Sequence, residues 1–272
     1  MIKSSSIKPF DSSMTYETHS CTDIGSVRKL NEDSLLAMPE SGLWVVADGM
    51  GGHSSGDFAS QTIVEELSSI GRPTGYLDLK ARFKARLENA NVLIRARANN
   101  LGGRTIGSTV VALLVQKNQF ACMWSGDSRM YRIRETQLDR LSRDHTEVQQ
   151  LLDSGSISIA EAETWPRKNV ITRAIGVSEK PELDIVEGMI EDADIFLLCS
   201  DGLTEYFQDD ELEHIFKIWL GEPYNRLCTY LIETALKRGG KDNITVIVIR
   251  CHRTGLAELA IEGHYPEVRE LS

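Results

Sequence analysis

The sequence predicts an α+β fold in which antiparallel β-sheets pack together and helices cover their outer faces. Apolar runs of strand length occur in both halves of the chain, whereas the helix-spaced patterns come in adjacent pairs. The elements therefore do not alternate as they do in a parallel βαβ chain. The 272 residues, of which 41% are hydrophobic, can build one large domain or two small ones, and no linker divides them.

The strand predicted most clearly is the apolar run 43–47, which ends at Asp48-Gly49. The run is too short for a typical helix and contains two β-branched valines, so it predicts a buried strand that brings the Asp48 carboxylate to a sheet edge. The glycines that follow allow the backbone to turn tightly and to approach a bound group. This stretch predicts a ligand site.

The same construction recurs with Asp127 after the run 120–126 and with Asp201 after the run 194–200, and Asp242 precedes the alternating run 244–249. One Asp-Gly after a strand is most often an ordinary turn. Turns do not need the same acid each time, however, and converging strand ends would make these carboxylates neighbours. Two such charges about 5 Å apart repel by roughly 3 kcal/mol at an effective dielectric near 20. The repetition therefore favours a site for divalent cations.

The remaining elements follow from apolar periodicity. Further strands are predicted at 16–22, 34–38, 107–115, 130–134 with a hairpin through 135–137, and 183–186. Helices are predicted at 58–70, 77–99, 145–152, 159–163, 209–216, 224–236 and 256–261. The polar run 28–33, taken alone, is equally well explained as a solvated connection.

Three segments lie outside the predicted core. Residues 1–14 are rich in Ser with Lys, Pro and Asp, and we expect a flexible leader. Residues 142–175 have a weak pattern, which predicts either a movable cover beside the site or a surface excursion without a role. Residues 252–272 form a polar tail. The predicted folded domain is 15–251.

Charge and cysteine content restrict the classes of partner. The chain has 30 Lys and Arg against 40 Asp and Glu, a net charge of -10 and a pI near 5.2, which disfavours nucleic acid and anionic membranes as partners. The five cysteines are scattered, without a C-x-x-C pair, and are predicted to be reduced packing residues. No signal peptide or membrane span is apparent. We expect a monomeric cytoplasmic protein.

Seven ordered motifs between about 18 and 250 resemble those of the metal-dependent protein phosphatases, the protein phosphatase 2C-like family, in its bacterial form. The motifs are Arg28-x-x-Asn31-Glu32-Asp33, Val46-Ala47-Asp48-Gly49-Met50-Gly51-Gly52-His53, Gly107-Ser108-Thr109, Gly126-Asp127-Ser128-Arg129, Asp144-His145-Thr146, Ser200-Asp201-Gly202 and Asp242-Asn243-Ile244-Thr245. The resemblance implies a four-layer α/β/β/α sandwich of two antiparallel sheets flanked by helices. It also implies a pair of Mn²⁺ or Mg²⁺ ions at one end, with a possible weaker third.

By this resemblance the metal ligands would be Asp33, Asp48, Gly49, Asp127, Asp201 and Asp242. Asp48 would bridge the two ions, and the Gly49 carbonyl would bind one of them. Asp201 and Asp242 would hold the other ion. Asp33 would act through metal-bound water, and Asp127 with Asp201 would bind the third metal. Oxygen ligands without a Cys or His cluster suit such hard cations better than Zn²⁺.

Arg28 is the candidate phosphate clamp, because a guanidinium can give two parallel hydrogen bonds to phosphate oxygens. Eukaryotic relatives have a histidine after Asp-Gly as the proposed general acid, and here that residue is Met50. His53 could donate the proton, or it could be a loop or helix-start residue. Trp165 stands where bacterial relatives often have a histidine in the cover segment.

The predicted function is hydrolysis of phosphoserine and phosphothreonine in proteins by a metal-activated water, reversing a bacterial serine/threonine kinase. The predicted partners are therefore phosphorylated proteins, including such a kinase and its substrates. Two alternatives stay open at this point. One is an inert phosphatase-like module that binds a phosphoprotein, and the other is a phosphatase of small phosphate esters.

Overall fold

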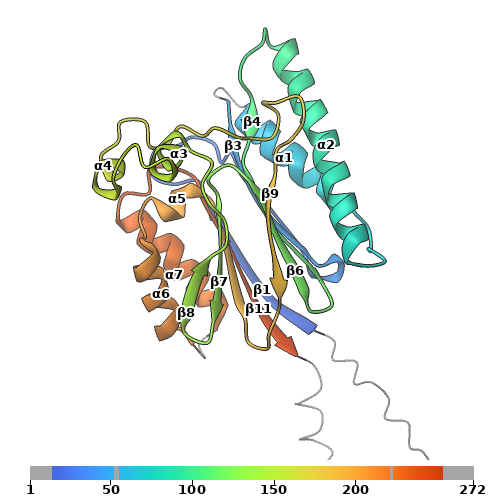
Figure 1. The fold of residues 1–272 in the computed structure, drawn as a ribbon, viewed down its shortest axis with the longest axis vertical. Coiled ribbons are helices and arrows are strands. Elements are labelled where there is room, and N and C mark those ends of the chain that lie inside the picture. Colours follow the sequence, from blue (N-terminus) through green and yellow to red (C-terminus); the bar gives the residue numbers. More distant parts are fainter. Residues whose placement is uncertain (1–13, 52–54, 221–222, 254–272) are drawn as a thin grey trace, which may run out of the picture.

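Strand β3 (Leu43–Met50) is buried on both faces, which explains why its sequence is continuously apolar. Leu43 and Val45 pack among helical side chains, whereas Trp44 and Val46 pack against a second sheet. The computed structural model, which describes residues 14–51, 55–220 and 223–253, has four layers: helices, sheet, sheet and helices (Figure 1). The predicted α/β/β/α sandwich is confirmed.

Both sheets are antiparallel throughout the described chain. The first sheet has the order β2 (Asp33–Met38), β3, β5 (Val110–Gln116), β6 (Gln119–Ser125) and β9 (Asp184–Met189), with β4 (Gly107–Ser108) paired to β3. The second has the order β1 (Met14–Asp23), β11 (Ile244–Arg253), β10 (Ile195–Cys199), β7 (Arg129–Arg134) and β8 (Gln137–Arg140). The layer between them is apolar and includes Phe120, Phe196 and Ile247.

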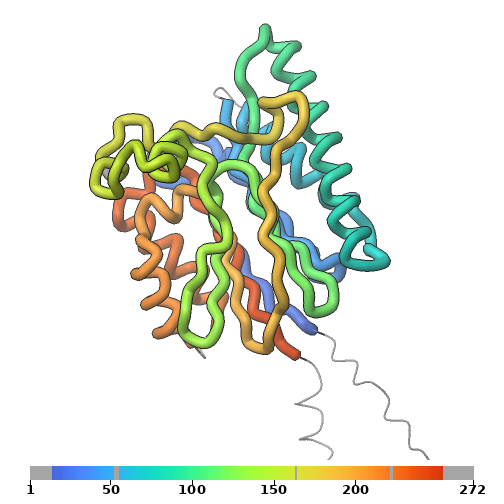
Figure 2. Tube along the Cα trace, in the orientation of Figure 1, coloured from blue at the N-terminus to red at the C-terminus, as the bar shows by residue number. Residues whose placement is uncertain are grey.

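Two pairs of helices form the outer layers. Helices α1 (Gly56–Ser68) and α2 (Tyr76–Asn100) cover the first sheet, and α6 (Asp209–Ile218) and α7 (Tyr224–Lys237) cover the second (Figures 1 and 2). The short helices α3 (Glu147–Asp153), α4 (Ile159–Glu163) and α5 (Asp201–Thr204) lie at one end of the sandwich. A 3-10 turn, η1 (Pro39–Ser41), connects β2 to β3.

Most predicted elements occur within a few residues of their predicted bounds, and the exceptions have local causes. The predicted strand 107–115 is interrupted at Thr109, whose hydroxyl accepts from the Asp48 N–H (3.1 Å) and bonds the Ser128 hydroxyl (2.7 Å). Helix α5 was not predicted, because four residues are too few to show a helical period. The predicted leader and the predicted helix 256–261 lie outside the described residues, except that Met14 begins β1.

The strand register gathers the predicted site acids at one end of the sandwich. Asp33 begins β2 directly opposite Asp48 on β3. In the second sheet Cys199 lies opposite both Arg129 and Val246, so the residues just beyond these strand ends are neighbours. Asp201 follows β10, and Asp242 precedes β11 at the same end. The register thus converts four distant sequence positions into one cluster.

Among the described residues, no helix combines the length and the hydrophobicity that crossing a bilayer requires.

The contact between α5 and the start of β11 depends on Gly202, because a Cβ atom there would overlap the Asn243 carbonyl oxygen. We expect Gly202→Ala to lower the free energy of unfolding by about 1–3 kcal/mol, the usual range for overpacking. Urea unfolding in excess chelator measures this. Gly75→Ala is the control, since a Cβ at Gly75 meets no atom within 4 Å. Equal midpoints for the two variants would contradict the assignment.

Candidate active site

Asp33 and Asp48 form the centre of the site. Asp33 is 8% exposed, and its Oδ2 accepts a 2.7 Å hydrogen bond from the Ser200 hydroxyl. Its Oδ1 is buried and has no partner among the described residues. Burial, opposed by hydrogen bonds from Thr245 and Ser200, raises the pKa of Asp33 to about 7, and the charges of the neighbouring acids act in the same direction. A buried, unpartnered carboxylate oxygen is costly, so this atom requires a proton or a cation.

Asp48 is held from both sides through its backbone. Thr109 N–H donates to the Asp48 carbonyl (2.8 Å), while Gly49 N–H donates to the Glu32 carbonyl (3.0 Å). The Glu32 carboxylate in turn accepts from the Gly56 N–H at the start of α1 (3.1 Å). Burial, followed by the charges of Asp33, Asp201, Asp127 and Asp242, raises the pKa of Asp48 well above its ordinary value.

Asp201 is the first residue of α5, immediately after Ser200. Its carboxyl group lies close to that of Asp48. Burial and the charge of Asp242 raise the pKa of Asp201 to about 6, although the hydrogen bond with Asp48 opposes the shift. The two sheets therefore meet, at this end, through a carboxyl–carboxyl contact.

Asp127 follows Gly126, whose φ of +109° favours glycine. Burial, together with the charges of Asp201 and Asp144, raises the pKa of Asp127 well above its ordinary value. Asp144 is itself paired, since Arg129 donates to it at 2.7 Å and Arg140 also bonds it. Asp127 has no such ion pair among the described residues, which leaves its oxygens open to a cation.

Asp242 lies at the rim, where its Oδ2 accepts a 2.6 Å hydrogen bond from Arg28. This hydrogen bond is the main cause of the raised pKa of Arg28. The Arg28 side chain is 48% exposed, and the charges of Glu32 and Asp48 also raise its pKa. Arg28, the predicted phosphate clamp, therefore lies beside the acidic cluster and is hydrogen-bonded to Asp242, a predicted metal ligand.

The six predicted ligands thus come together, although their side chains do not enclose a metal position. Within 14–51, 55–220 and 223–253, no three Asp, Glu, His or Cys side chains are arranged to hold one ion. Two of these carboxylates already have partners, because Ser200 donates to Asp33 and Arg28 donates to Asp242. The all-oxygen donor set, the mutual charges that raise the pKa values, and the unpartnered Asp33 oxygen nevertheless fit hard divalent cations.

Several supporting residues were not assigned roles from the sequence, although they lie within the motifs. Asn243 accepts from the Glu32 N–H (2.8 Å) and donates to the carbonyls of Ile24 and Leu30, which fixes the segment before Asp33. His145 is buried, and its Nδ1 accepts from the Gly126 N–H (3.1 Å) beside Asp127. Its burial lowers its pKa. The signal that could have found them is their place in the motifs, where Asn243 follows Asp242 and His145 follows Asp144.

The predicted cover, residues 142–175, flanks the acids. A groove of about 910 Å³ runs between α3 and α4 on one side and α5 and α6 on the other, and Asp127 and Asp201 are in its wall. Trp165 is half-buried and does not line this groove. Met50 pairs with Gly107 on β4. His53 lies outside the described residues, so its role stays a prediction.

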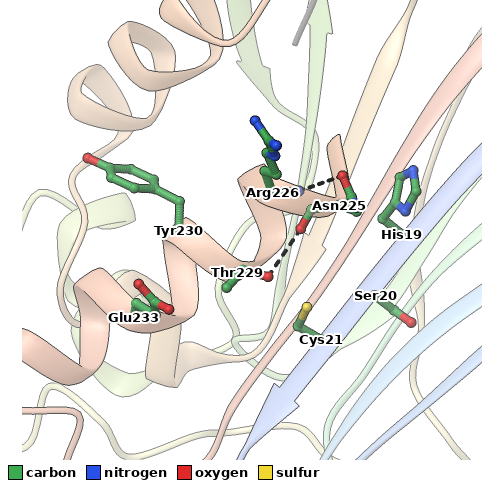
Figure 3. Close-up of a pocket in the computed structure, with 8 residues that line it drawn as sticks. All are labelled: His19, Ser20, Cys21, Asn225, Arg226, Thr229, Tyr230 and Glu233. Carbon is green, nitrogen blue, oxygen red and sulfur yellow. Dashed lines mark hydrogen bonds between the residues drawn. The ribbon is translucent and has the colours of Figure 1, made fainter. Parts of the chain in front are cut away.

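A separate pocket of about 370 Å³ lies between β1 and α7 and contains none of the predicted site residues (Figure 3). Side chains of Asn225, Arg226 and Tyr230 from α7 surround it, together with His19 and Cys21 from β1. The candidate active site is therefore the acidic cluster and not this pocket.

The fold and the acidic site are those of a metal-dependent hydrolase, and the comparisons with known proteins define it further. A sequence profile described as Protein phosphatase 2C matches residues 26–245. The chain is 35% identical over 238 residues to the serine/threonine phosphatase stp of Listeria welshimeri, covering 84% of this chain and 93% of that protein. The chain belongs to the protein phosphatase 2C family, and the predicted class of enzyme is confirmed.

Two solved structures agree with this assignment. PppA, described as a key regulatory component of T6SS in Pseudomonas aeruginosa, superimposes with a TM-score of 0.80 at 41% identity, covering 88% of this chain and 99% of that chain. The catalytic domain of the serine threonine protein phosphatase PstP, in complex with two manganese ions, superimposes with a TM-score of 0.76 at 34% identity, covering 88% and 99%.

The raised pKa values predict how stability depends on pH in the absence of metal. The folded pKa values of Asp33 (about 7) and Asp201 (about 6) exceed the ordinary value of 3.8, so the folded state retains protons that the unfolded chain releases. Stability should therefore fall as the pH rises from about 4 to about 7, by an amount on the order of a few kcal/mol. Urea unfolding in excess chelator at several pH values measures the slope.

Asp201→Asn should flatten that slope, because it removes one of the coupled carboxyl groups. Glu65→Gln on the exposed face of α1 is the control and should leave it unchanged. A metal-free protein that becomes more stable between pH 4 and pH 7 would contradict the pKa directions.

Proposed function

We propose that the chain is a metal-dependent serine/threonine protein phosphatase whose active site is the carboxylate cluster at the end of the two sheets. The observation that carries the proposal is the convergence of Asp33, Asp48, Asp201 and Asp242 at one sandwich end, with Arg28 beside them. The manganese complex of PstP and the names of the relatives support it.

The residues proposed to hold Mn²⁺ or Mg²⁺ are Asp33, Asp48, the Gly49 carbonyl, Asp201 and Asp242, with Asp127 and Asp201 at a weaker third position. When bound, such cations neutralise phosphoryl charge and lower the pKa of the attacking water. They would also neutralise the mutual repulsion of the carboxylates. Without cations, this repulsion is relieved only when the carboxylates are protonated.

The chain itself supplies orientation and charge. The half-exposed guanidinium of Arg28 would bind two phosphoryl oxygens of the substrate when it exchanges its Asp242 partner for them. Asp33, fixed by Ser200, would accept a hydrogen bond from the attacking water through its free oxygen. Proton donation to the leaving group by His53 stays a prediction.

The proposed substrates are proteins phosphorylated by a serine/threonine kinase. The open groove beside the cover favours protein substrates over small phosphate esters, because it extends the site along α5 and α6. An inert binding module is disfavoured, since every predicted ligand is present. The cognate kinase, the monomeric state and the cytoplasmic location stay predictions.

The direct test is phosphate release from matched phosphothreonine, phosphoserine and phosphotyrosine peptides with Mn²⁺, with Mg²⁺ and with excess chelator. We expect release from the first two peptides only when metal is present. Release that is unaffected by chelator would contradict the metal-dependent mechanism, and absence of release under any metal would favour the inert module.

Asp201→Ala and Asp242→Asn should each reduce Mn²⁺-dependent turnover of a phosphothreonine peptide by about a hundredfold or more, because each removes a proposed metal ligand. Stopped assays at saturating peptide measure kcat, and isothermal titration with Mn²⁺ measures binding. The control is Asp139→Asn on β8, an acid paired with Arg132 away from the cluster. Near-normal turnover in either site variant would contradict the ligand assignment.

Arg28→Ala should raise KM for the phosphopeptide about tenfold and lower kcat less, if Arg28 mainly binds the phosphoryl group. Arg28→Lys should restore part of the loss, because it returns the charge without the two-pronged geometry. Steady-state kinetics of the three proteins measure this. An unchanged KM in Arg28→Ala would remove Arg28 from the phosphate site.

A further inference from the structure

A small cationic pocket lies at the same end of the molecule, on the side of α2. Its volume is about 210 Å³, and its lining includes Arg95 from α2, Arg104 and Thr105 from the loop before β4, and Gly176 and Val177. The loop that follows α2 and the segment around Gly176 run side by side there (Figure 1). We call this feature the arginine pocket, defined by Arg95 and Arg104.

The arginine pocket is connected to the candidate active site through the backbone. Gly51, three residues after Asp48, approaches the pocket wall, since a Cβ on it would lie 3.4 Å from the Ile106 Cα atom and from the Thr105 carbonyl oxygen. Met50, the residue before Gly51, is paired with Gly107 where β3 lies beside β4. Three extended residues span about 10 Å at most, which is the upper limit on the distance between the Asp48 and Gly51 Cα atoms.

The two guanidinium groups have no acid to neutralise them among the residues that the structure describes. Within residues 14–51, 55–220 and 223–253, Arg95 and Arg104 form no ion pair, and the pocket lining contains no acid. Some other arginines do have acidic partners, as Arg82 has Asp78 on the same helix and Arg129 has Asp144. In a chain with a net charge of -10, two arginines that line one pocket without an acid provide local positive charge for an anion.

The opposite side of the active site has the opposite charge. The groove beside the cover is lined by six acids against three bases. The acids are Asp127, Asp144, Asp201, Glu205, Asp209 and Asp210, and the bases are Arg129, Arg140 and Lys168. Asp127 and Asp201 are proposed metal ligands, and Asp144 and Asp209 are paired with arginines, so the acids that would repel an anionic side chain from this groove are Glu205 and Asp210. The asymmetry gives a bound peptide a preferred direction across the site.

We propose that the arginine pocket binds an anionic side chain of the phosphoprotein substrate, two or three residues from the phosphorylated residue that is hydrolysed. The anion is a second phosphate or a carboxylate, both of which accept two parallel hydrogen bonds from a guanidinium. Extended peptide advances about 3.3 Å per residue, so two or three residues cover about 7–10 Å, which is comparable to the upper limit between Asp48 and Gly51. This inference rests on the proposed phosphoprotein phosphatase activity.

The test uses phosphothreonine peptides that differ only in one residue placed two or three positions away, on either side: phosphoserine, glutamate or alanine. The wild-type protein with Mn²⁺ should hydrolyse the phosphoserine and glutamate peptides with kcat/KM about tenfold above the alanine peptide on one side of the phosphothreonine. The preference should weaken as salt is raised, because the pocket is open to solvent. Comparing the phosphoserine peptide with the glutamate peptide distinguishes a site for phosphate from a site for any anion.

The variant Arg95→Gln with Arg104→Gln should lose this preference and keep its kcat/KM for the alanine peptide. Arg95→Lys with Arg104→Lys should retain part of the preference. Lys84→Gln is the matched control, because it removes one charge from an exposed position eleven residues before Arg95 on α2, about 16 Å along the helix. It should behave as wild type.

Equal hydrolysis of all peptides, or a preference that survives Arg95→Gln with Arg104→Gln, overturns the inference while leaving the phosphatase function intact. Failure to hydrolyse any peptide refutes the proposed function instead. Fluorescence anisotropy of the same peptides in excess chelator then examines the pocket without turnover. There the anionic peptides should bind more tightly than the alanine peptide only when both arginines are present, and equal affinities overturn the inference.

Discussion

The mutual repulsion of buried carboxylates is the constraint on which the rest of the structure depends. Asp33 and Asp127 are buried, Asp48 and Asp201 are partly buried, and the four charges act on one another, so the pKa values of all four lie above the ordinary value for an aspartate. Such a cluster is tolerable only when the surrounding backbone is rigid and the charge is compensated. The hydrogen-bonded framework around it provides the rigidity, and protons or cations provide the compensation.

The framework is built so that each sheet supplies part of the cluster. The first sheet holds Asp33 and Asp48 opposite each other, and the second sheet places Asp201 at the start of a four-residue helix. Ser200 joins the two sheets by donating to Asp33 and accepting from the Thr245 N–H. The apolar layer between the sheets therefore does more than stabilise the fold, because it fixes the spacing of two half-sites that neither sheet could form alone.

The surface around the cluster is divided by charge. Ion pairs between Asp144 and the arginines 129 and 140 organise the groove on the cover side, where acids still outnumber bases. On the side of α2, Arg95 and Arg104 carry charge that no described acid neutralises. Such an arrangement would orient a bound phosphopeptide, since one end of the peptide is attracted where the other is repelled.

The sequence by itself determined the layers, most of the strands and helices, and the identity of the acids, because apolar periodicity and strand–Asp junctions are local signals. It also indicated the family through seven ordered motifs. Tertiary structure alone decided three features. Register placed Asp33 opposite Asp48, the Thr109 contacts interrupted the predicted strand 107–115, and Arg28 met Asp242 across 214 positions of sequence. These depend on contacts between distant segments, for which neither periodicity nor spacing carries a signal, and the same holds for the pairing state of Arg95 and Arg104.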